Sequence, residues 1–169
     1  MKHLSIYLSL IAIIFLLTAC PDPTSVPLAK KGTIKVDNFF VGNWSTNDEL
    51  EEVENFIVTK NDDYSFKIEA KVWDFITDET SVEKFIAWFV RLDRYDFVVA
   101  QQLTSNNQLT DDYFLYNYEI SSGKLLLRTV KISDEISKEI TTSENYKKQI
   151  LLLMQNKNFL SSPTIYKRK

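Results

Sequence analysis

Residues 54–72 read ENFIVTKNDDYSFKIEAKV, and this stretch decides the fold class. In its second half, polar residues alternate with apolar ones, which are Tyr64, Phe66, Ile68, Ala70 and Val72. A period of two is typical of a β-strand with one buried and one solvent-facing side. The polar triplet Asn61-Asp62-Asp63 separates this strand from the apolar run before it and predicts a turn. The sequence therefore predicts an antiparallel hairpin here.

Two further pairs of apolar runs follow, each joined by a short polar turn. They are residues 83–92 and 95–102 around Asp93-Arg94, and residues 113–120 and 124–131 around Ser121-Ser122-Gly123. The first pair is partly apolar on both faces, so we expect central strands whose outward surface is partly covered. The sequence thus predicts a mainly β fold, an antiparallel meander of seven or eight strands with a C-terminal α-helix. Such a meander can close into a barrel, and an open sheet with the helix on one face is the alternative.

The C-terminal part of the chain changes to helical spacing. Residues 133–140 predict one short helix, because isoleucines stand four residues apart at Ile132, Ile136 and Ile140. Thr141 with Glu144 three positions later resembles a capping box and predicts a helix through about Lys157. The residues expected to face inward are Tyr146, Ile150, Leu153 and Met154. Residues 165–168 predict a short last strand.

The N-terminus has the features of a secretory signal. Lys2 supplies a positive charge, and residues 4–17 form an apolar run without any charge. This run is shorter than the ~20 residues that a membrane-spanning helix needs, whereas it has the length of a signal-peptide core. We therefore predict that residues 1–19 are a signal peptide. An uncleaved anchor helix is the alternative.

The tetrapeptide Leu17-Thr18-Ala19-Cys20 resembles the lipobox of bacterial lipoproteins. The resemblance implies cleavage between Ala19 and Cys20 and a diacylglyceryl group on the Cys20 thiol. Two or more acyl chains anchor a protein stably to a membrane. We expect a location in the cell envelope, anchored to the membrane by lipid. Asp22 does not directly follow the cysteine, and by resemblance to the enterobacterial sorting rule this implies the outer membrane, facing the periplasm, if the host is Gram-negative.

A proline-rich segment follows Cys20 and contains Pro21, Pro23 and Pro27. Its composition excludes a stable helix or a central strand. We predict that residues 20–33 are the lipidated cysteine and a tether, and that residues 34–169 form a single β-rich domain. An extended tether of this length spans ~40 Å, so the domain is expected to stand off the membrane.

Several short segments of the body, taken together in chain order, form a pattern. They are Gly42-Asn43-Trp44 at the first strand, Val90-Arg91-Leu92 before a turn, the strands at 113–116 and 125–127, and the C-terminal helix. The pattern resembles small bacterial lipocalin-like or calycin-like domains over most of residues 39–168. The resemblance implies that Trp44 packs across the closed end of a barrel, with Arg168 of the last strand as its partner. The alternative is that Trp44 is ordinary core and Arg168 a solvated charge.

The composition excludes several classes of site. His3 is the only histidine and Cys20 the only cysteine, so a processed chain lacks the usual general base, catalytic triads and most zinc sites. Three glycines are too few for a glycine-rich phosphate loop. The acidic run Asp48–Glu52 and the pair Asp111-Asp112 contain ligands suited to calcium, although solvated surface is the commoner role of such groups. We predict no catalytic residue, no metal site and no cofactor.

Three functional hypotheses remain open. The first is a non-enzymatic envelope lipoprotein that binds a protein or another envelope component at the membrane surface. The second is a lipocalin-like carrier of a small apolar ligand inside an aromatic-lined barrel. The third is a hydrolase that works with carboxylates alone. The net charge of −3 argues against nucleic acid as a partner.

Overall fold

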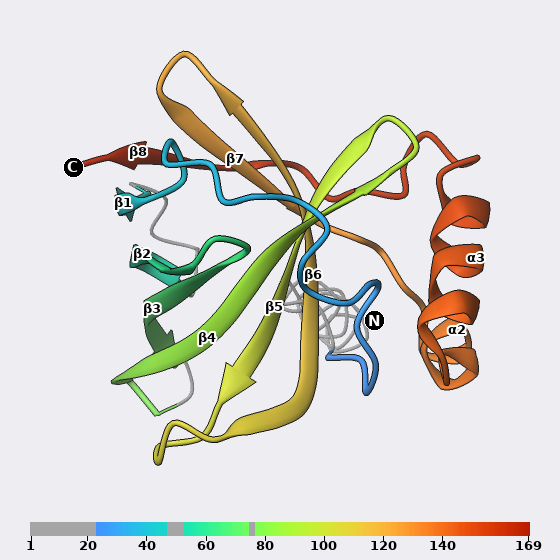
Figure 1. Cartoon of the computed structure of the whole chain (residues 1–169), viewed down its shortest axis with the longest axis horizontal. Coiled ribbons are helices and arrows are strands. Elements are labelled where there is room, and N and C mark those ends of the chain that lie inside the picture. The colour runs from blue at the N-terminus through green and yellow to red at the C-terminus, as the bar shows by residue number, and fades with distance from the viewer. Residues whose placement is uncertain (1–22, 47–52, 75–76) are drawn as a thin grey trace, which may run out of the picture.

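The computed structural model describes residues 23–46, 53–74 and 77–169. Ala19, Cys20 and the acidic run Asp48–Glu52 lie outside the described residues. Eight antiparallel strands form a closed barrel in chain order (Figure 1). The strands are β1 (Gly42–Ser45), β2 (Val53–Asp62), β3 (Ser65–Asp74), β4 (Glu79–Leu92), β5 (Tyr95–Leu103), β6 (Leu109–Ser121), β7 (Lys124–Thr129) and β8 (Thr164–Arg168). The predicted β meander is confirmed, and the sheet is closed rather than open.

Short hairpin turns set the register of the meander. The turn between β6 and β7 has φ values of +52° at Ser122 and +75° at Gly123, the backbone that two-residue hairpin loops require. The barrel closes where β1 pairs with β8, with Trp44 opposite Arg168. Each strand therefore has a hydrogen-bonded neighbour on both sides.

The interior of the barrel is an apolar core to which all eight strands contribute. Its rings are interlocked: Phe66 lies 4.9 Å from Phe89 and 5.1 Å from Phe40, and Phe89 stacks on Tyr118 at 4.7 Å between ring centroids. Burial raises the pKa of Tyr118 to about 12, because the charged phenolate is disfavoured among these rings. The fully buried or nearly buried members are Phe40, Trp44, Phe56, Val58, Phe66, Ala70, Ala87, Phe89, Val98, Ala100, Leu125 and Tyr166.

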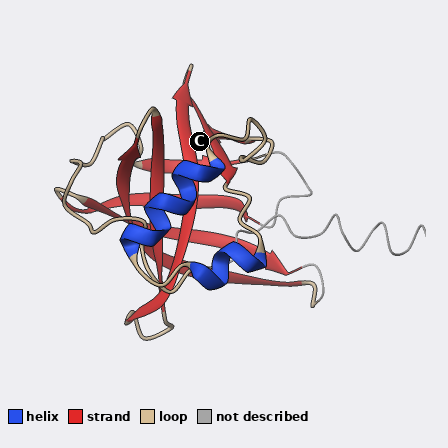
Figure 2. Cartoon of the chain, turned by 90° about the vertical axis from the view of Figure 1, so that its right-hand side faces the viewer, coloured by secondary structure: helices blue, strands red, loops and turns tan. Residues whose placement is uncertain are grey.

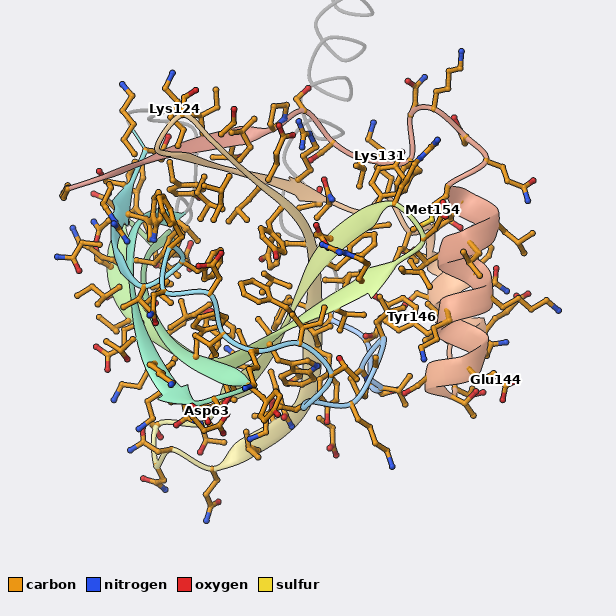
Figure 3. The ribbon with its side chains drawn as sticks, turned by 45° about the horizontal axis from the view of Figure 1, so that its top comes forward. Asp63, Lys124, Lys131, Glu144, Tyr146 and Met154 are labelled. Atoms are coloured by element: carbon orange, nitrogen blue, oxygen red, sulfur yellow. The ribbon has the colours of Figure 1, made fainter. Side chains whose placement is uncertain are left out.

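A second apolar core lies outside the barrel. It forms between the outward faces of β4, β5 and β6 and a layer made of α2 (Asp134–Glu139), α3 (Ser143–Leu153) and the N-terminal segment. Figure 2 shows the two helices lying across the strands, and Figure 3 shows Tyr146 between α3 and the barrel. The prediction that the central strands are covered on their outward surface is confirmed. The buried members are Leu28, Ala29, Trp88, Val90, Phe97, Val99, Leu115, Val130, Ile140, Tyr146, Ile150 and Phe159.

The ends of α3 differ from the sequence prediction. The N-cap is Thr142, whose hydroxyl accepts from the Asn145 amide, so the predicted capping box between Thr141 and Glu144 is wrong. The helix ends at Leu153 rather than near Lys157. The chain tightens there, since the Gln155 and Asn156 amides donate to the carbonyls of Leu152 and Leu153, three residues back, in place of the four-residue spacing of an α-helix.

The inward face of α3 is the one that its spacing predicted. Tyr146 and Ile150 are buried, and Leu153 and Met154 pack against the same outer core.

Among the described residues, no helix combines the length and the apolar composition needed to cross a bilayer.

Part of the segment expected to be a tether is packed on the barrel. Thr24 and Tyr113 exchange two backbone hydrogen bonds of 2.8 and 2.9 Å. Leu28 is fully buried, and the Ser143 hydroxyl donates to the Pro27 carbonyl at 2.7 Å. The free tether predicted over residues 20–33 is therefore corrected for residues 24–29, where burial of Leu28 and Ala29 favours docking over extension.

Candidate functional site

The three residues of the lipocalin-like motif lie together at one end of the barrel. The Arg168 guanidinium carbon is 5.5 Å from the centroid of the Trp44 ring, a cation–π arrangement. The same guanidinium donates to the backbone carbonyls of Phe39 and Val41. Trp44 is 1% exposed, and its indole N–H donates to the Phe40 carbonyl at 2.9 Å. Arg168 thus links the last strand to the loop that leads into β1.

Gly42 is needed at this end for two reasons. Its φ of +150° lies in a region that L side chains rarely adopt. A Cβ atom placed there would lie 2.9 Å from Nε of Arg168, which is closer than a real Cβ contact. A side chain at position 42 would therefore displace the guanidinium from its place over Trp44.

A cleft of about 750 Å³ lies on the outer wall of the barrel rather than inside it. Strands β3 to β6 form its floor, and the N-terminal segment at Pro27–Lys31 forms one side. Figure 1 shows this segment crossing in front of the strands, in blue. The charged lining residues are Lys30, Lys31, Lys67, Glu69 and Lys84, and Tyr113 lies among the polar ones.

Strand register explains which side chains meet in the cleft. One row across the wall is Lys67, Ile86, Gln101 and Tyr113, each directly opposite the next. The adjacent row on the same face is Glu69, Lys84, Leu103 and Leu109. Residues opposite each other in an antiparallel sheet share a face, so charged and apolar groups stand side by side along both rows.

The charge of the cleft is opposite in sign to that of the chain. Four of its five charged lining residues are lysines, and Glu69 is the only acid among them, whereas the whole chain has a net charge of −3. Lys84 is half-buried and lies 3.5 Å from the Asn107 side-chain oxygen. Such a concentration of one charge in a concave site favours ligands of the opposite charge.

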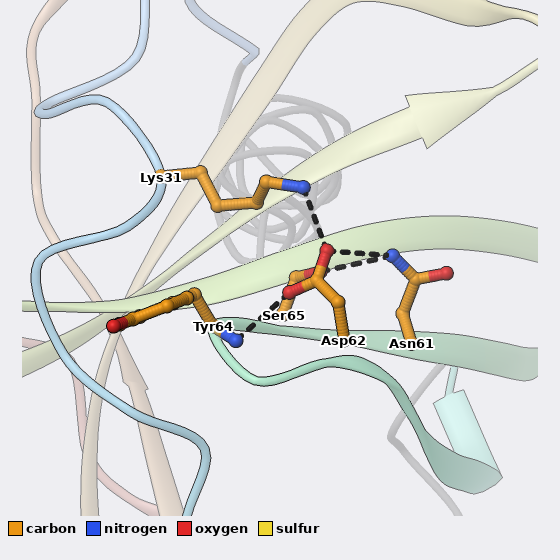
Figure 4. A network of polar contacts seen from close by, with 5 residues as sticks. All are labelled: Lys31, Asn61, Asp62, Tyr64 and Ser65. Atoms are coloured by element: carbon orange, nitrogen blue, oxygen red, sulfur yellow. Dashed lines mark hydrogen bonds and ion pairs between the residues drawn. The ribbon is translucent and has the colours of Figure 1, made fainter.

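One of these lysines is held in place by a polar network at the β2–β3 turn. Lys31 Nζ donates to the Asp62 carboxylate at 2.8 Å, and Asp62 also accepts from the Tyr64 amide and the Asn61 side chain (Figure 4). The Lys31 hydrogen bond is the main reason that the pKa of Asp62 lies well below its ordinary value. The ion pair fixes the N-terminal segment along the rim of the cleft.

The floor of the cleft is partly aromatic. The Trp88 indole N–H donates to the Ala29 carbonyl at 2.9 Å, and its ring meets the Tyr113 ring edge to face at 6.3 Å. Gln101 donates to the Tyr113 hydroxyl at 3.1 Å. Burial, and secondarily the nearby Asp111 carboxylate, raise the pKa of Tyr113. Tyr113 is therefore a neutral hydrogen-bonding group at ordinary pH.

The described residues include no group of three or more His, Cys, Asp or Glu side chains that could hold a metal ion. Asp111 and Asp112 are exposed neighbours on strand β6. Successive side chains of a strand point to opposite faces, so these two carboxylates do not converge on one ion. The acidic run Asp48–Glu52 lies outside the described residues.

No protein-family model, curated protein or solved structure matches this chain. The fold and the surface chemistry are therefore the basis for any functional conclusion. Sequence reasoning singled out Gly42, Trp44 and Arg168, which the structure brings together. It missed the lysine-lined cleft. The sequence placed Lys67 on the polar face of a predicted strand. Only the register of the paired strands shows that Lys84 lies near Lys67.

Proposed function

We propose that this protein is a membrane-anchored envelope lipoprotein whose barrel binds an envelope component and catalyses no reaction. The observation that carries the proposal is the cleft on the outer wall, which combines lysines with an apolar floor. Lysines with apolar neighbours bind anionic groups that also have an apolar part. The lipobox-like tetrapeptide ending at Cys20 supports a location at the membrane surface.

A binding role fits the chemistry of the cleft better than a catalytic one. Among the described residues, the lining contains no histidine and no cysteine, and Glu69 is its only carboxylate. A hydrolase of the kind considered above needs two carboxyl groups that flank the scissile bond. The cleft does not supply such a pair.

The second candidate function is a lipocalin-like carrier. The packing of Trp44 beneath Arg168 at one end of the barrel is the observation that favours it. In this case an apolar ligand would occupy the interior. Phe40, Phe66 and Phe89 already pack there ring against ring at 4.9–5.3 Å, so a ligand would have to separate them. We therefore place this function second.

Metabolic labelling with a fatty acid tests the anchor. Wild-type chain expressed in a Gram-negative bacterium should incorporate the label, and Cys20→Ser should not. The matched control combines Cys20→Ser with Ser25→Cys, which keeps one cysteine but moves it out of the lipobox, and it should stay unlabelled. Equal labelling of the wild type and the control, or an unlabelled wild type, would contradict the proposed anchor.

A further inference from the structure

The cleft lies close to the predicted anchor point along the chain. Thr24 is paired with Tyr113, which lines the cleft. Only four peptide steps separate Thr24 from Cys20. Because an extended chain spans at most ~3.6 Å per residue, the Cα atoms of these two residues lie within roughly 14 Å of each other. A lipid on Cys20, as proposed above, would therefore lie within reach of the Thr24 end of the cleft and not at the end of a long tether.

The wall that bears the cleft also carries exposed apolar side chains. Leu109 is 59% exposed and lies in the same row as Lys84. Val82 is 61% exposed and lies opposite Lys71 on the outer face of β4. Ile57 is 44% exposed and lies opposite Glu69. Exposed apolar groups flanked by lysines are typical of surfaces that rest in the headgroup region of a bilayer.

We propose that this wall faces the anchoring membrane and that the cleft binds the headgroup of an anionic lipid. Lys67, Lys84 and Lys30 would contact the phosphate, and the apolar floor would contact the glycerol and the first part of the acyl chains. The inference rests on the proposed function only for the position of the anchor. The binding site itself is defined by described residues of the barrel and of the N-terminal segment that packs on it.

The composition of the cleft selects this ligand class over simpler ones. Inorganic phosphate would leave Ile86 and Leu103 without a partner, since it has no apolar part. A zwitterionic lipid offers the same apolar part but no net charge to Lys30, Lys67 and Lys84, the cleft lysines other than the ion-paired Lys31. Glu69 lies opposite Lys84 and offsets part of the positive charge, so the site favours one anionic headgroup rather than a polyanion.

Lysine footprinting on the full chain in a neutral detergent tests the proposal. The chain is acetylated with and without short-chain phosphatidylglycerol, and modification of each lysine is read by mass spectrometry. We expect modification of Lys67 and Lys84 to fall several-fold, while the exposed residues Lys124 and Lys157 are unchanged. The parallel ligands are glycerol phosphate and short-chain phosphatidylcholine, and both should protect far less.

A double variant separates the charge of the cleft from its shape. Lys67→Gln with Lys84→Gln should weaken phosphatidylglycerol binding several-fold, as read from protection of Lys30. Lys124→Gln with Lys157→Gln should not. Equal protection by phosphatidylcholine would overturn the headgroup assignment, and equal protection by glycerol phosphate would overturn the lipid. Absence of any protection would overturn the inference without touching the anchor, which fatty-acid labelling of Cys20 tests separately.

Discussion

The two apolar cores of this protein differ in how they are built. The interior core takes alternate residues from all eight strands, whereas the outer core joins three strands to two helices and a proline-rich segment. The interior core is surrounded by the closed ring of strands. The outer core covers only part of the wall, and the lysine cleft begins where that cover stops, at Lys30 and Lys31. The part of the wall that the helices and the N-terminal segment leave uncovered is therefore the surface available for binding.

The largest expected effect is on the interior core. Trp44→Ala removes a ring that is 1% exposed together with its hydrogen bond to Phe40. We expect a loss of about 3–5 kcal/mol in the free energy of unfolding, as for other buried aromatic residues. Urea melts measure this loss, and Trp73→Ala at a half-buried position is the control. An unchanged urea midpoint in Trp44→Ala would contradict the buried packing of Trp44 in the interior core.

We expect residues of the outer core to contribute to stability as ordinary buried residues do, although a proline-rich segment covers part of this core. Leu28 is fully buried, so Leu28→Ala should cost about 2–5 kcal/mol. Leu152 on α3 is 50% exposed, and Leu152→Ala should stay within about 0.5 kcal/mol of the wild type. Thermal or urea melts of both variants make the comparison. If the two leucines cost the same, the segment is only loosely docked and the two cores are not equivalent.

Gly42→Ala tests the link between Gly42 and Arg168 at the closed end. The added Cβ meets the guanidinium in an unfavourable backbone conformation, so we expect a loss of about 1–3 kcal/mol. In an Arg168→Ala background the clash with the guanidinium is absent, so Gly42→Ala should cost only the free energy of the unfavourable backbone conformation. A double-mutant cycle measures this coupling. Strictly additive effects would show that the two residues do not interact.

The smallest expected effect concerns the ion pair at the rim of the cleft. Asp62 has a lowered pKa in the folded state, so its contribution is present above the ordinary aspartate pKa of about 3.9 and is lost as pH falls below it. Because both partners are largely exposed, Lys31→Gln should cost less than about 1 kcal/mol at pH 7. The difference from wild type should shrink progressively below about pH 4. Melts at several pH values check this, and a difference that grows in acid would contradict the assignment.

The sequence predicted the interior core well and the outer core only in part. Alternation from Phe66 to Val72 is a local property, so it identified β3 and its inward face without tertiary information. Tyr64, which the same alternation placed on that face, lies in the β2–β3 turn and is 37% exposed, because the strand begins only at Ser65. Strands β4 and β5 are partly apolar on both faces, which indicated that other residues cover their outward surface. Leu28 as the covering residue could not be predicted, because its proline-rich context is typical of a linker.

The lysine cleft could not be predicted from the sequence either. Lys30, Lys67 and Lys84 are far apart in the chain and look like ordinary polar positions. They converge because β3 and β4 are paired in one register and the N-terminal segment crosses them. By contrast, the pairing of Trp44 with Arg168 was anticipated from the lipocalin-like pattern, since a closed meander brings its first and last strands together.

The central claim is that ligands bind on the outer wall while the interior stays filled. Bromine-labelled short-chain phosphatidylglycerol tests it, because bromine quenches tryptophan fluorescence only at close range. Two single-tryptophan chains are compared: one keeps Trp88 in the wall of the cleft, and the other keeps Trp44 inside the barrel. Phenylalanine replaces the other tryptophans. We expect strong quenching of Trp88 and little quenching of Trp44, whereas preferential quenching of Trp44 would contradict binding on the outer wall and place the ligand inside the barrel.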